Sequence, residues 1–169
     1  KVLAYAQKVD WETVYQAELP RVYNFFRYRL GEDRLAEDLT SDTFEKAWRN
    51  RGRYRHDLSA FSTWLFTIAK NLAVDHFRRQ NREISLDEAG DLKAAENVED
   101  AAGRHDDFHR LSLLLGCLSD RERELVALKY GADLTNRAIA MITGLSESNV
   151  GTILHRVMQQ LRVEWEDER

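Results

Sequence analysis

Apolar residues recur at spacings of three and four along most of this chain, and this periodicity restricts the fold more than any other feature of the sequence. Only one Pro and eight Gly occur among 169 residues, which is too few for a loop-rich β fold. Hydrophobic residues make up 43% of the chain, so it can also bury a core and does not have the composition of a disordered segment. We therefore predict an all-α protein.

Three helices are predicted in the first half of the chain. The first covers about residues 11–30; we expect it to be broken or restarted at Pro20, which suits a first helical turn, and to end at Gly31. The second covers about residues 33–50 and the third about residues 59–82, each with apolar residues along one face.

The second half carries the start signals of a helix-turn-helix. A short helix over about residues 106–116 is followed by the sequence SDRE at 119–122, which has the pattern of a capping box. Farther on, a small residue, a turn residue and a buried residue stand at the spacing that two crossing helices require, and Ser146 precedes the last helix as a cap. These three residues are Ala140, Gly144 and Val150.

Charge divides the chain into blocks. Residues 44–82 hold nine Lys and Arg against three acids, although the whole chain has a net charge of −4, so this block is a candidate surface for binding a polyanion. Residues 83–108 hold nine acids against two cations. We predict two helical domains, residues 10–82 and 108–164, joined by an acidic linker over residues 83–107. The linker is either solvated, which we favour, or folded back on the basic block as a polyanion mimic.

The sequence disfavours catalysis. The single cysteine, Cys117, excludes a disulfide framework and a multi-cysteine zinc site, and we expect it to be a small buried residue. His105 and His109 lie four positions apart beside acids, but a solvated linker end suits them better than a metal site. A Gly-rich phosphate loop and a catalytic triad are both absent from the sequence, so we predict a binding protein with no cofactor and no metal.

No apolar run is long enough to cross a bilayer, and we expect a cytoplasmic location. An upstream signal is not excluded, because the sequence begins with Lys and not with Met.

The basic loop that precedes the third helix interleaves cations with aromatic rings. The sequence RYRH at 53–56 is followed by Phe61 and Trp64. Such a mixture suits a protein that holds a phosphate backbone and unstacked bases together, but it also fits a solvated loop over core aromatics. The RRQNR run at 78–82 is compatible with a helix C-terminus or with phosphate contact.

Three motifs in this order resemble a bacterial sigma factor of the extracytoplasmic-function (ECF) group, in the sigma-70 family. They are DLTSDTFEKAW at 38–48, FSTWLFTIAKNLAVDHFRR at 61–79, and LSDRERELV at 118–126, which leads into the helix-turn-helix. The resemblance covers nearly the whole chain apart from the linker and both ends. It implies two helical domains that bind core RNA polymerase and read the −10 and −35 promoter elements.

The resemblance also implies roles for individual residues. Docking on the polymerase clamp would involve Asp38, Leu39, Asp42, Phe44 and Trp48, with Phe44 and Trp48 divided between core and interface. Capture of a flipped −10 base and of the melted strand would involve Arg53, Tyr54, Arg55, His56, Phe61, Trp64, Lys70, Asn71, Asp75, Arg78 and Arg79, although Asp75 also fits a structural pair with a neighbouring Arg. In the −35 duplex, the candidates for contact with the major groove would be Ser148, Asn149, Thr152, His155 and Arg156, and Arg121 and Lys129 would lie nearer the phosphates.

The second domain departs from the family pattern. Gly151 and Ile153 stand where the family usually has cations, and residues 108–163 hold only seven Lys and Arg against five acids. Fewer phosphate contacts lower sequence-independent affinity. We therefore expect weak or unusual −35 recognition, or a second domain that mainly engages the polymerase flap or another transcription regulator.

The leading functional prediction is a promoter-specificity subunit, and the alternative is a sigma-like mimic or adaptor that binds an anti-sigma factor or regulator without initiating transcription. An anti-sigma partner is implied by the resemblance alone.

Overall fold

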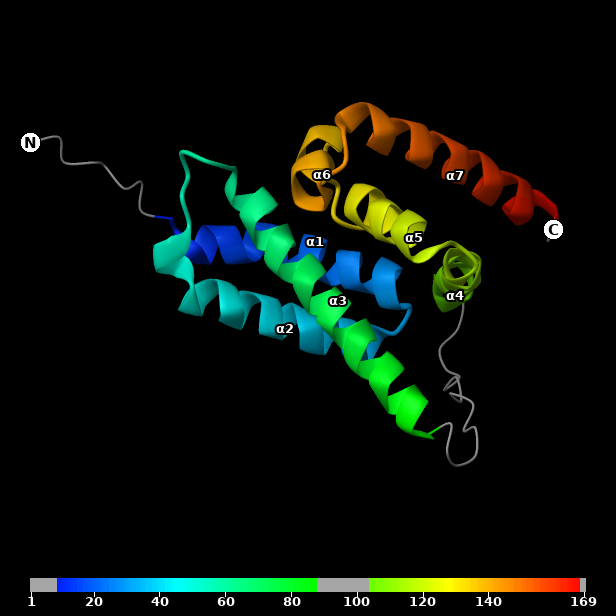
Figure 1. The fold of residues 1–169 in the computed structure, drawn as a ribbon, viewed down its shortest axis with the longest axis horizontal. Coiled ribbons are helices and arrows are strands. Elements are labelled where there is room, and N and C mark those ends of the chain that lie inside the picture. The colour runs from blue at the N-terminus through cyan, green and yellow to red at the C-terminus, as the bar shows by residue number, and fades with distance from the viewer. Residues whose placement is uncertain (1–8, 88–103, 168–169) are drawn as a thin grey trace, which may run out of the picture.

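Helices supply all the regular structure in the residues that the computed structural model describes, which are 9–87 and 104–167 (Figure 1). The fold class predicted from the sequence is therefore confirmed for these residues. In chain order the elements are α1 (Trp11–Leu30), α2 (Asp33–Arg49), the 3₁₀ turn η1 (Arg51–Arg53), α3 (Phe61–Asp87), α4 (Arg104–Gly116), α5 (Asp120–Val126), the π-helical segment η2 (Ala127–Gly131), α6 (Asn136–Thr143) and α7 (Glu147–Asp167).

Helix α1 is continuous, so the predicted break at Pro20 is wrong. Proline costs a helix interior one hydrogen bond and about 3 kcal/mol. Buried residues lie on both sides of it, Glu18 before and Val22 after, and their packing holds the two halves of the helix in line. Gly31 ends the helix as predicted, with a φ of 75° that suits glycine.

The predicted linker is shorter than its acidic composition indicated. Helix α3 continues to Asp87, because residues 83–87 include good helix formers that need no buried partner, and α4 already begins at Arg104. The rest of the predicted linker, residues 88–103, lies outside the described residues. The prediction that it is either solvated or folded back on the basic block concerns these residues.

The helix-turn-helix prediction is confirmed in its local geometry. The Ser119 hydroxyl accepts from the backbone N of Glu122 at 3.3 Å, and the Glu122 carboxylate accepts from the backbone N of Ser119 at 3.1 Å, so the capping box is complete. Gly144 turns the chain after α6 with a φ of 77°, and the Ser146 hydroxyl caps α7 by accepting from Asn149 N at 3.1 Å. Val150 is fully buried.

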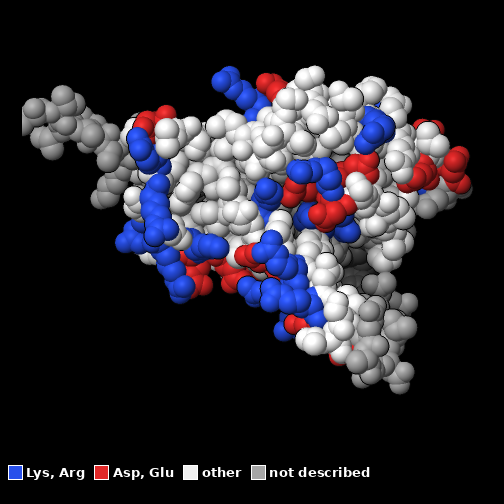
Figure 2. All heavy atoms as spheres, in the orientation of Figure 1, with Lys and Arg blue, Asp and Glu red and all other residues white. Residues whose placement is uncertain are grey.

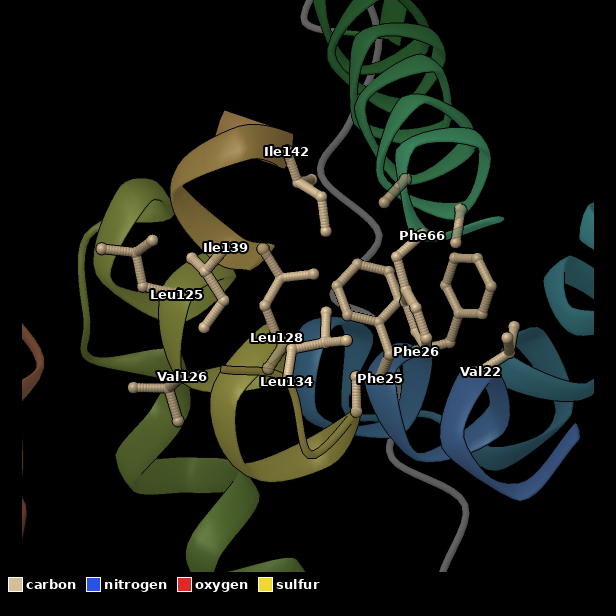
Figure 3. Close-up of a cluster of buried hydrophobic side chains, with 14 of the residues drawn as sticks. Val22, Phe25, Phe26, Phe66, Leu125, Val126, Leu128, Leu134, Ile139 and Ile142 are labelled. Atoms are coloured by element: carbon tan, nitrogen blue, oxygen red, sulfur yellow. The ribbon is translucent and has the colours of Figure 1, made fainter. Parts of the chain in front are cut away.

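The two predicted domains share one hydrophobic core (Figure 3). Phe25 of α1 and Phe66 of α3 face Leu128, Ile139 and Ile142 from η2 and α6, and all five are buried. The described part of the chain is therefore packed as one body, in which α1 and α3 of the first domain lie against η2 and α6 of the second.

Gly131 marks the closest approach between the domains. A Cβ atom at this position would lie 2.9 Å from the backbone oxygen of Asn24 and 3.1 Å from Cα of Phe25, both in α1. Its φ is not in the left-handed region, so steric room for α1 is what requires glycine there.

Two arginines of α1 add polar contacts across this interface. Arg21 Nε donates to the carbonyl oxygen of Ala132 at 2.8 Å. Arg29 Nη2 lies 2.6 Å from a carboxylate oxygen of Asp120, and the Arg29 side chain is only 2% exposed. Its guanidinium carbon lies 4.5 Å from the ring centre of Phe77, so an aromatic face covers the buried charge.

The expectation that Cys117 is buried is wrong. Its side chain is exposed just beyond the end of α4, and its thiol lies 3.5 Å from the carbonyl oxygen of Leu113, to which it donates. The sequence around Cys117 does not show which residues of other helices lie near it, so its burial could not be predicted from the sequence.

Within residues 9–87 and 104–167, no helix has the combination of length and apolar character that crossing a bilayer demands.

Candidate nucleic-acid interface

The residues assigned to polymerase docking divide by burial. Asp38, Asp42 and Trp48 lie on the exposed side of α2, whereas Leu39 and Phe44 are 8% and 9% exposed and belong to the core. The first three form a surface that a partner can reach, and the other two support the helix from below. The resemblance left Phe44 and Trp48 divided between core and interface. Phe44 is buried in the core, and Trp48 is exposed.

Three aromatic rings from the predicted −10 site form a compact cluster. Tyr54 lies 5.3 Å from Phe61 and 5.2 Å from Trp64 between ring centres, and Phe61 lies 5.5 Å from Trp64. The Tyr54 hydroxyl donates to the carbonyl oxygen of Ser59 at 3.2 Å, and burial raises the pKa of this phenol above its usual value. The rings are half-buried, so each keeps some accessible surface.

Trp11 joins this cluster to α2, a contact that the sequence analysis missed. Its ring lies 5.2 Å from Trp48 and 5.6 Å from Phe61, edge to face in both pairs. The guanidinium of Arg51 lies 4.1 Å from the ring centre of Trp48. In the sequence, Trp11 is one of the apolar residues that recur at helical spacing, and nothing else indicated its contacts with Trp48 and Phe61.

Cations surround the aromatic cluster on the loop between α2 and α3. Arg53, Arg55 and His56 are all exposed, and Figure 2 shows blue side chains gathered over this turn. Arg55 donates to both carboxylate oxygens of Asp57, at 3.2 and 2.6 Å, and this contact lowers the pKa of Asp57. The loop therefore offers cations next to stackable rings, with one of the cations held by a neighbouring acid.

Helix α3 presents the remaining predicted −10 residues in two directions. Asn71, Arg78 and Arg79 are exposed, and the second blue region of Figure 2 covers the C-terminal half of this helix. Asp75 lies 3.9 Å from Arg78, which fits the structural alternative considered for it. Lys70 points toward the second domain, where its Nζ lies 3.5 Å from the carbonyl oxygen of Ile142.

Helix α7 exposes every residue predicted for it on the −35 surface. The hydroxyl of Thr152 donates back to the carbonyl oxygen of Ser148 at 3.0 Å, and both are exposed. The exposed members of this face are Ser148, Asn149, Thr152, His155 and Arg156.

Two of the cations predicted for the −35 surface pair with acids of α5. Arg156 Nη2 donates to Glu122 Oε1 at 3.0 Å, and Arg121 lies 3.5 Å from Glu124. Lys129, in η2, is half-buried. The sequence predicted only the capping role of Glu122. Its contact with Arg156 joins residues 34 positions apart, so the neighbouring sequence gives no indication of it.

Comparisons with known proteins assign both halves of the chain. Residues 14–83 match the family model described as Sigma-70 region 2, and residues 114–163 match the one described as Sigma-70, region 4. The RNA polymerase sigma factor YlaC of Bacillus subtilis is 30% identical over 155 residues, covering 89% of this chain and 89% of YlaC. The chain belongs to the sigma-70 family, in its ECF group.

Two further relatives carry the ECF description in their names. This sigma factor is 28% identical to the ECF sigma factor SigM of B. subtilis over 152 residues, covering 89% of this chain and 92% of SigM. It is 32% identical to the ECF sigma factor BldN of Streptomyces coelicolor over 143 residues, which are 83% of this chain but only 54% of BldN. The chain thus spans about half the length of BldN.

The fold is similar to that of a solved sigma factor, RpoE from Bartonella quintana, whose structure is a complex with the anti-sigma factor NepR. The TM-score is 0.75 at 23% identity, covering 95% of this chain and 99% of RpoE. Members of this family are transcription initiation factors and not enzymes.

Proposed function

We propose that this sigma factor binds core RNA polymerase through the exposed side of α2 and captures the melted −10 strand at the aromatic cluster. The observation that carries the proposal is the chain of rings from Trp48 through Trp11 to Phe61, Tyr54 and Trp64, which joins the two surfaces directly. Cations on the adjoining loop lie where a phosphate backbone would pass.

Strand opening requires no hydrolysis in this arrangement. Stacking of an unpaired base on an aromatic ring contributes about 1–3 kcal/mol, and opening one base-pair step costs a similar amount. Arg53 and His56 are exposed beside the rings and would neutralise phosphates of the same strand. The single-stranded form is then favoured over the duplex at this position.

Reading both promoter elements at once requires the two domains to separate. The −10 and −35 elements are about 25 base pairs apart, which is roughly 85 Å along B-DNA. A compact chain of this length has a radius of gyration of only about 15 Å. We infer that the shared core seen in Figure 3 opens when the chain is part of a promoter complex.

The −35 surface is proposed to read neutral groups more than phosphates. Ser148, Asn149 and Thr152 supply hydroxyl and amide groups suited to base edges, while Gly151 and Ile153 supply no charge. We therefore propose that −35 affinity is weak in the absence of polymerase, or that this domain also engages protein.

A regulatory partner is part of the proposal. RpoE of B. quintana was solved in complex with the anti-sigma factor NepR, and CnrH was solved in complex with the cytosolic domain of CnrY. We propose an anti-sigma factor for this chain as well, and a cytoplasmic location, because core polymerase and genomic DNA are found there.

The first experiment mixes the purified chain with bacterial core RNA polymerase and fragmented genomic DNA from its source, and sequences the 5′ ends of the transcripts. Discrete start sites that share upstream elements are expected. Polymerase binding without specific starts would contradict the proposal and favour a mimic or adaptor.

Variants separate the two surfaces. Trp64→Ala with Asn71→Ala should abolish promoter opening and leave polymerase binding intact, whereas Asp42→Ala with Trp48→Ala should abolish polymerase binding. Glu37→Ala is the matched control, because Glu37 is an exposed acid of α2 that is not assigned to the docking surface. Normal transcription by both double variants would refute the site assignment.

A further inference from the structure

Glu122, which is not among the residues predicted to bind DNA, forms an ion pair with Arg156, which is among them. Glu122 Oε1 accepts from Nη2 of Arg156 at 3.0 Å, joining the first turn of α5 to the middle of α7. The Arg156 side chain is 69% exposed and that of Glu122 is 20% exposed. The acid is thus anchored in the protein while the guanidinium it holds faces solvent.

The other oxygen of the same carboxylate is already committed. Glu122 Oε2 accepts from the backbone N of Ser119 at 3.1 Å and from its hydroxyl at 2.8 Å. Together with Arg156, these contacts lower the pKa of Glu122, so it is charged at neutral pH. Because both oxygens are bonded, the carboxylate has little freedom to rotate and gives Arg156 a stationary partner.

We propose that Glu122 is a positioning residue for promoter recognition, which holds the Arg156 guanidinium oriented toward a phosphate of the −35 duplex. This inference rests on the proposed function, since it takes α7 as the helix that meets the duplex.

The composition of α7 gives this one contact unusual weight. Arg156 is the first Lys or Arg of the helix, since residues 147–155 contain neither. It lies one turn beyond Thr152 on the exposed face. A guanidinium has five N–H donors, and Glu122 uses one of them, so donors remain for a phosphate. Holding the side chain in place before binding removes part of the entropy that binding would otherwise cost.

The sign of the effect distinguishes positioning from simple electrostatics. If Glu122 only contributed a negative charge near a polyanion, its removal would tighten DNA binding. If it orients Arg156, its removal weakens binding, because Arg156 must then be ordered at the moment of contact. Immobilising one long side chain corresponds to about 0.5–1.5 kcal/mol, which is roughly a two- to tenfold change in affinity.

The test is a double-mutant cycle on the holoenzyme. Wild type, Glu122→Ala, Arg156→Ala and the double variant are each assembled with core polymerase. Their binding to a fluorescent promoter fragment, taken from the mapped start sites, is then measured across a range of salt concentrations. We expect Glu122→Ala to weaken binding about two- to tenfold, and to have no weakening effect in the Arg156→Ala background. Arg156→Ala should lower the salt slope by about 1, as loss of a phosphate contact does.

A control and a stability measurement complete the design. Glu147→Gln removes another exposed acid, in the first turn of α7, and should bind equally or more tightly. Fraying of α5 through loss of the cap would weaken binding in both backgrounds equally, and urea unfolding of each variant measures it directly.

The outcomes separate the inference from the function it rests on. Wild-type binding with unchanged or tighter binding by Glu122→Ala overturns the positioning role alone, as does equal weakening with and without Arg156. Failure of the wild-type holoenzyme to bind the fragment overturns the −35 assignment and the positioning role together.

Discussion

The close approach of α1 to η2 predicts a sharp effect for Gly131→Ala. The added Cβ would lie 2.9 Å from the oxygen of Asn24 and 3.1 Å from Cα of Phe25. Both atoms belong to the backbone of a helix, so no side chain can rotate away, and α1 and η2 must move apart by several tenths of an ångström.

Two opposing contributions determine the size of this effect. Overpacking of this kind costs about 1–3 kcal/mol, whereas replacing glycine by alanine in a helical conformation returns up to about 1 kcal/mol. The net expectation is a loss of about 1–2 kcal/mol in the free energy of unfolding. For a chain of this length, that is a fall in Tm of roughly 2–8 °C.

Urea and thermal unfolding of the full chain measure this change. Gly52→Ala is the matched control, because a Cβ atom at Gly52 would meet nothing within 4 Å beyond its chain neighbours, and the φ of Gly52 is not left-handed. It should change stability by less than about 0.5 kcal/mol. If Gly131→Ala were as stable as the wild type while Gly52→Ala behaved as expected, the direct packing of the two domains would be refuted.

Other substitutions test the interface and both proposed surfaces. Asp120→Ala should destabilise the chain by about 1.5–3 kcal/mol in urea unfolding, because the buried Arg29 guanidinium loses a charge-assisted hydrogen bond, and adding Arg29→Met should recover most of that loss. Phe44→Ala should cost about 3–5 kcal/mol as a core truncation, whereas Trp48→Ala should cost about 1 kcal/mol or less and instead abolish polymerase capture in a pull-down. Gly151→Lys should tighten binding of the holoenzyme to promoter DNA and steepen its salt dependence by about 0.9 in a log–log plot, and an unchanged slope would place this position away from phosphates.

Local signals in the sequence predicted the helices and their ends well. The SDRE sequence at 119–122 forms the capping box, and Gly31 and Gly144 end their helices in the left-handed conformation. Each of these features depends on a few neighbouring residues, whose side chains satisfy backbone groups at a helix end. The same locality explains why the order of the helices was correct.

Tertiary packing was beyond such signals. The periodicity of α1 showed an apolar face but not that Phe25 would meet Leu128, which lies in the other predicted domain. Pro20 indicated a break that packing on both sides overrides, and Cys117 is exposed although Leu115 and Leu118 on either side of it are buried. In each case the deciding contact, or its absence, involves residues far apart in the sequence.

Ion pairing explains how a chain with a net charge of −4 can present cations to a polyanion. Arg55, Arg121 and Arg156 each lie within 3.5 Å of a carboxylate in the protein, and each is at least half exposed. Only the Arg55–Asp57 pair is exposed on both sides, and such a pair contributes about 0–1 kcal/mol, because water screens both charges. The side chains of Glu124 and Glu122 are only 7% and 20% exposed. Exchanging the carboxylate of Asp57 for a phosphate therefore costs little, whereas Arg156 can keep Glu122 and contact a phosphate through its remaining donors. The pair between Arg29 and Asp120 is different, because the Arg29 side chain is buried although Asp120 is exposed, and this arginine cannot leave without breaking the core. Exposure thus separates the arginines that we propose for DNA contact from Arg29, which is part of the core, a distinction that the charge count along the sequence does not contain.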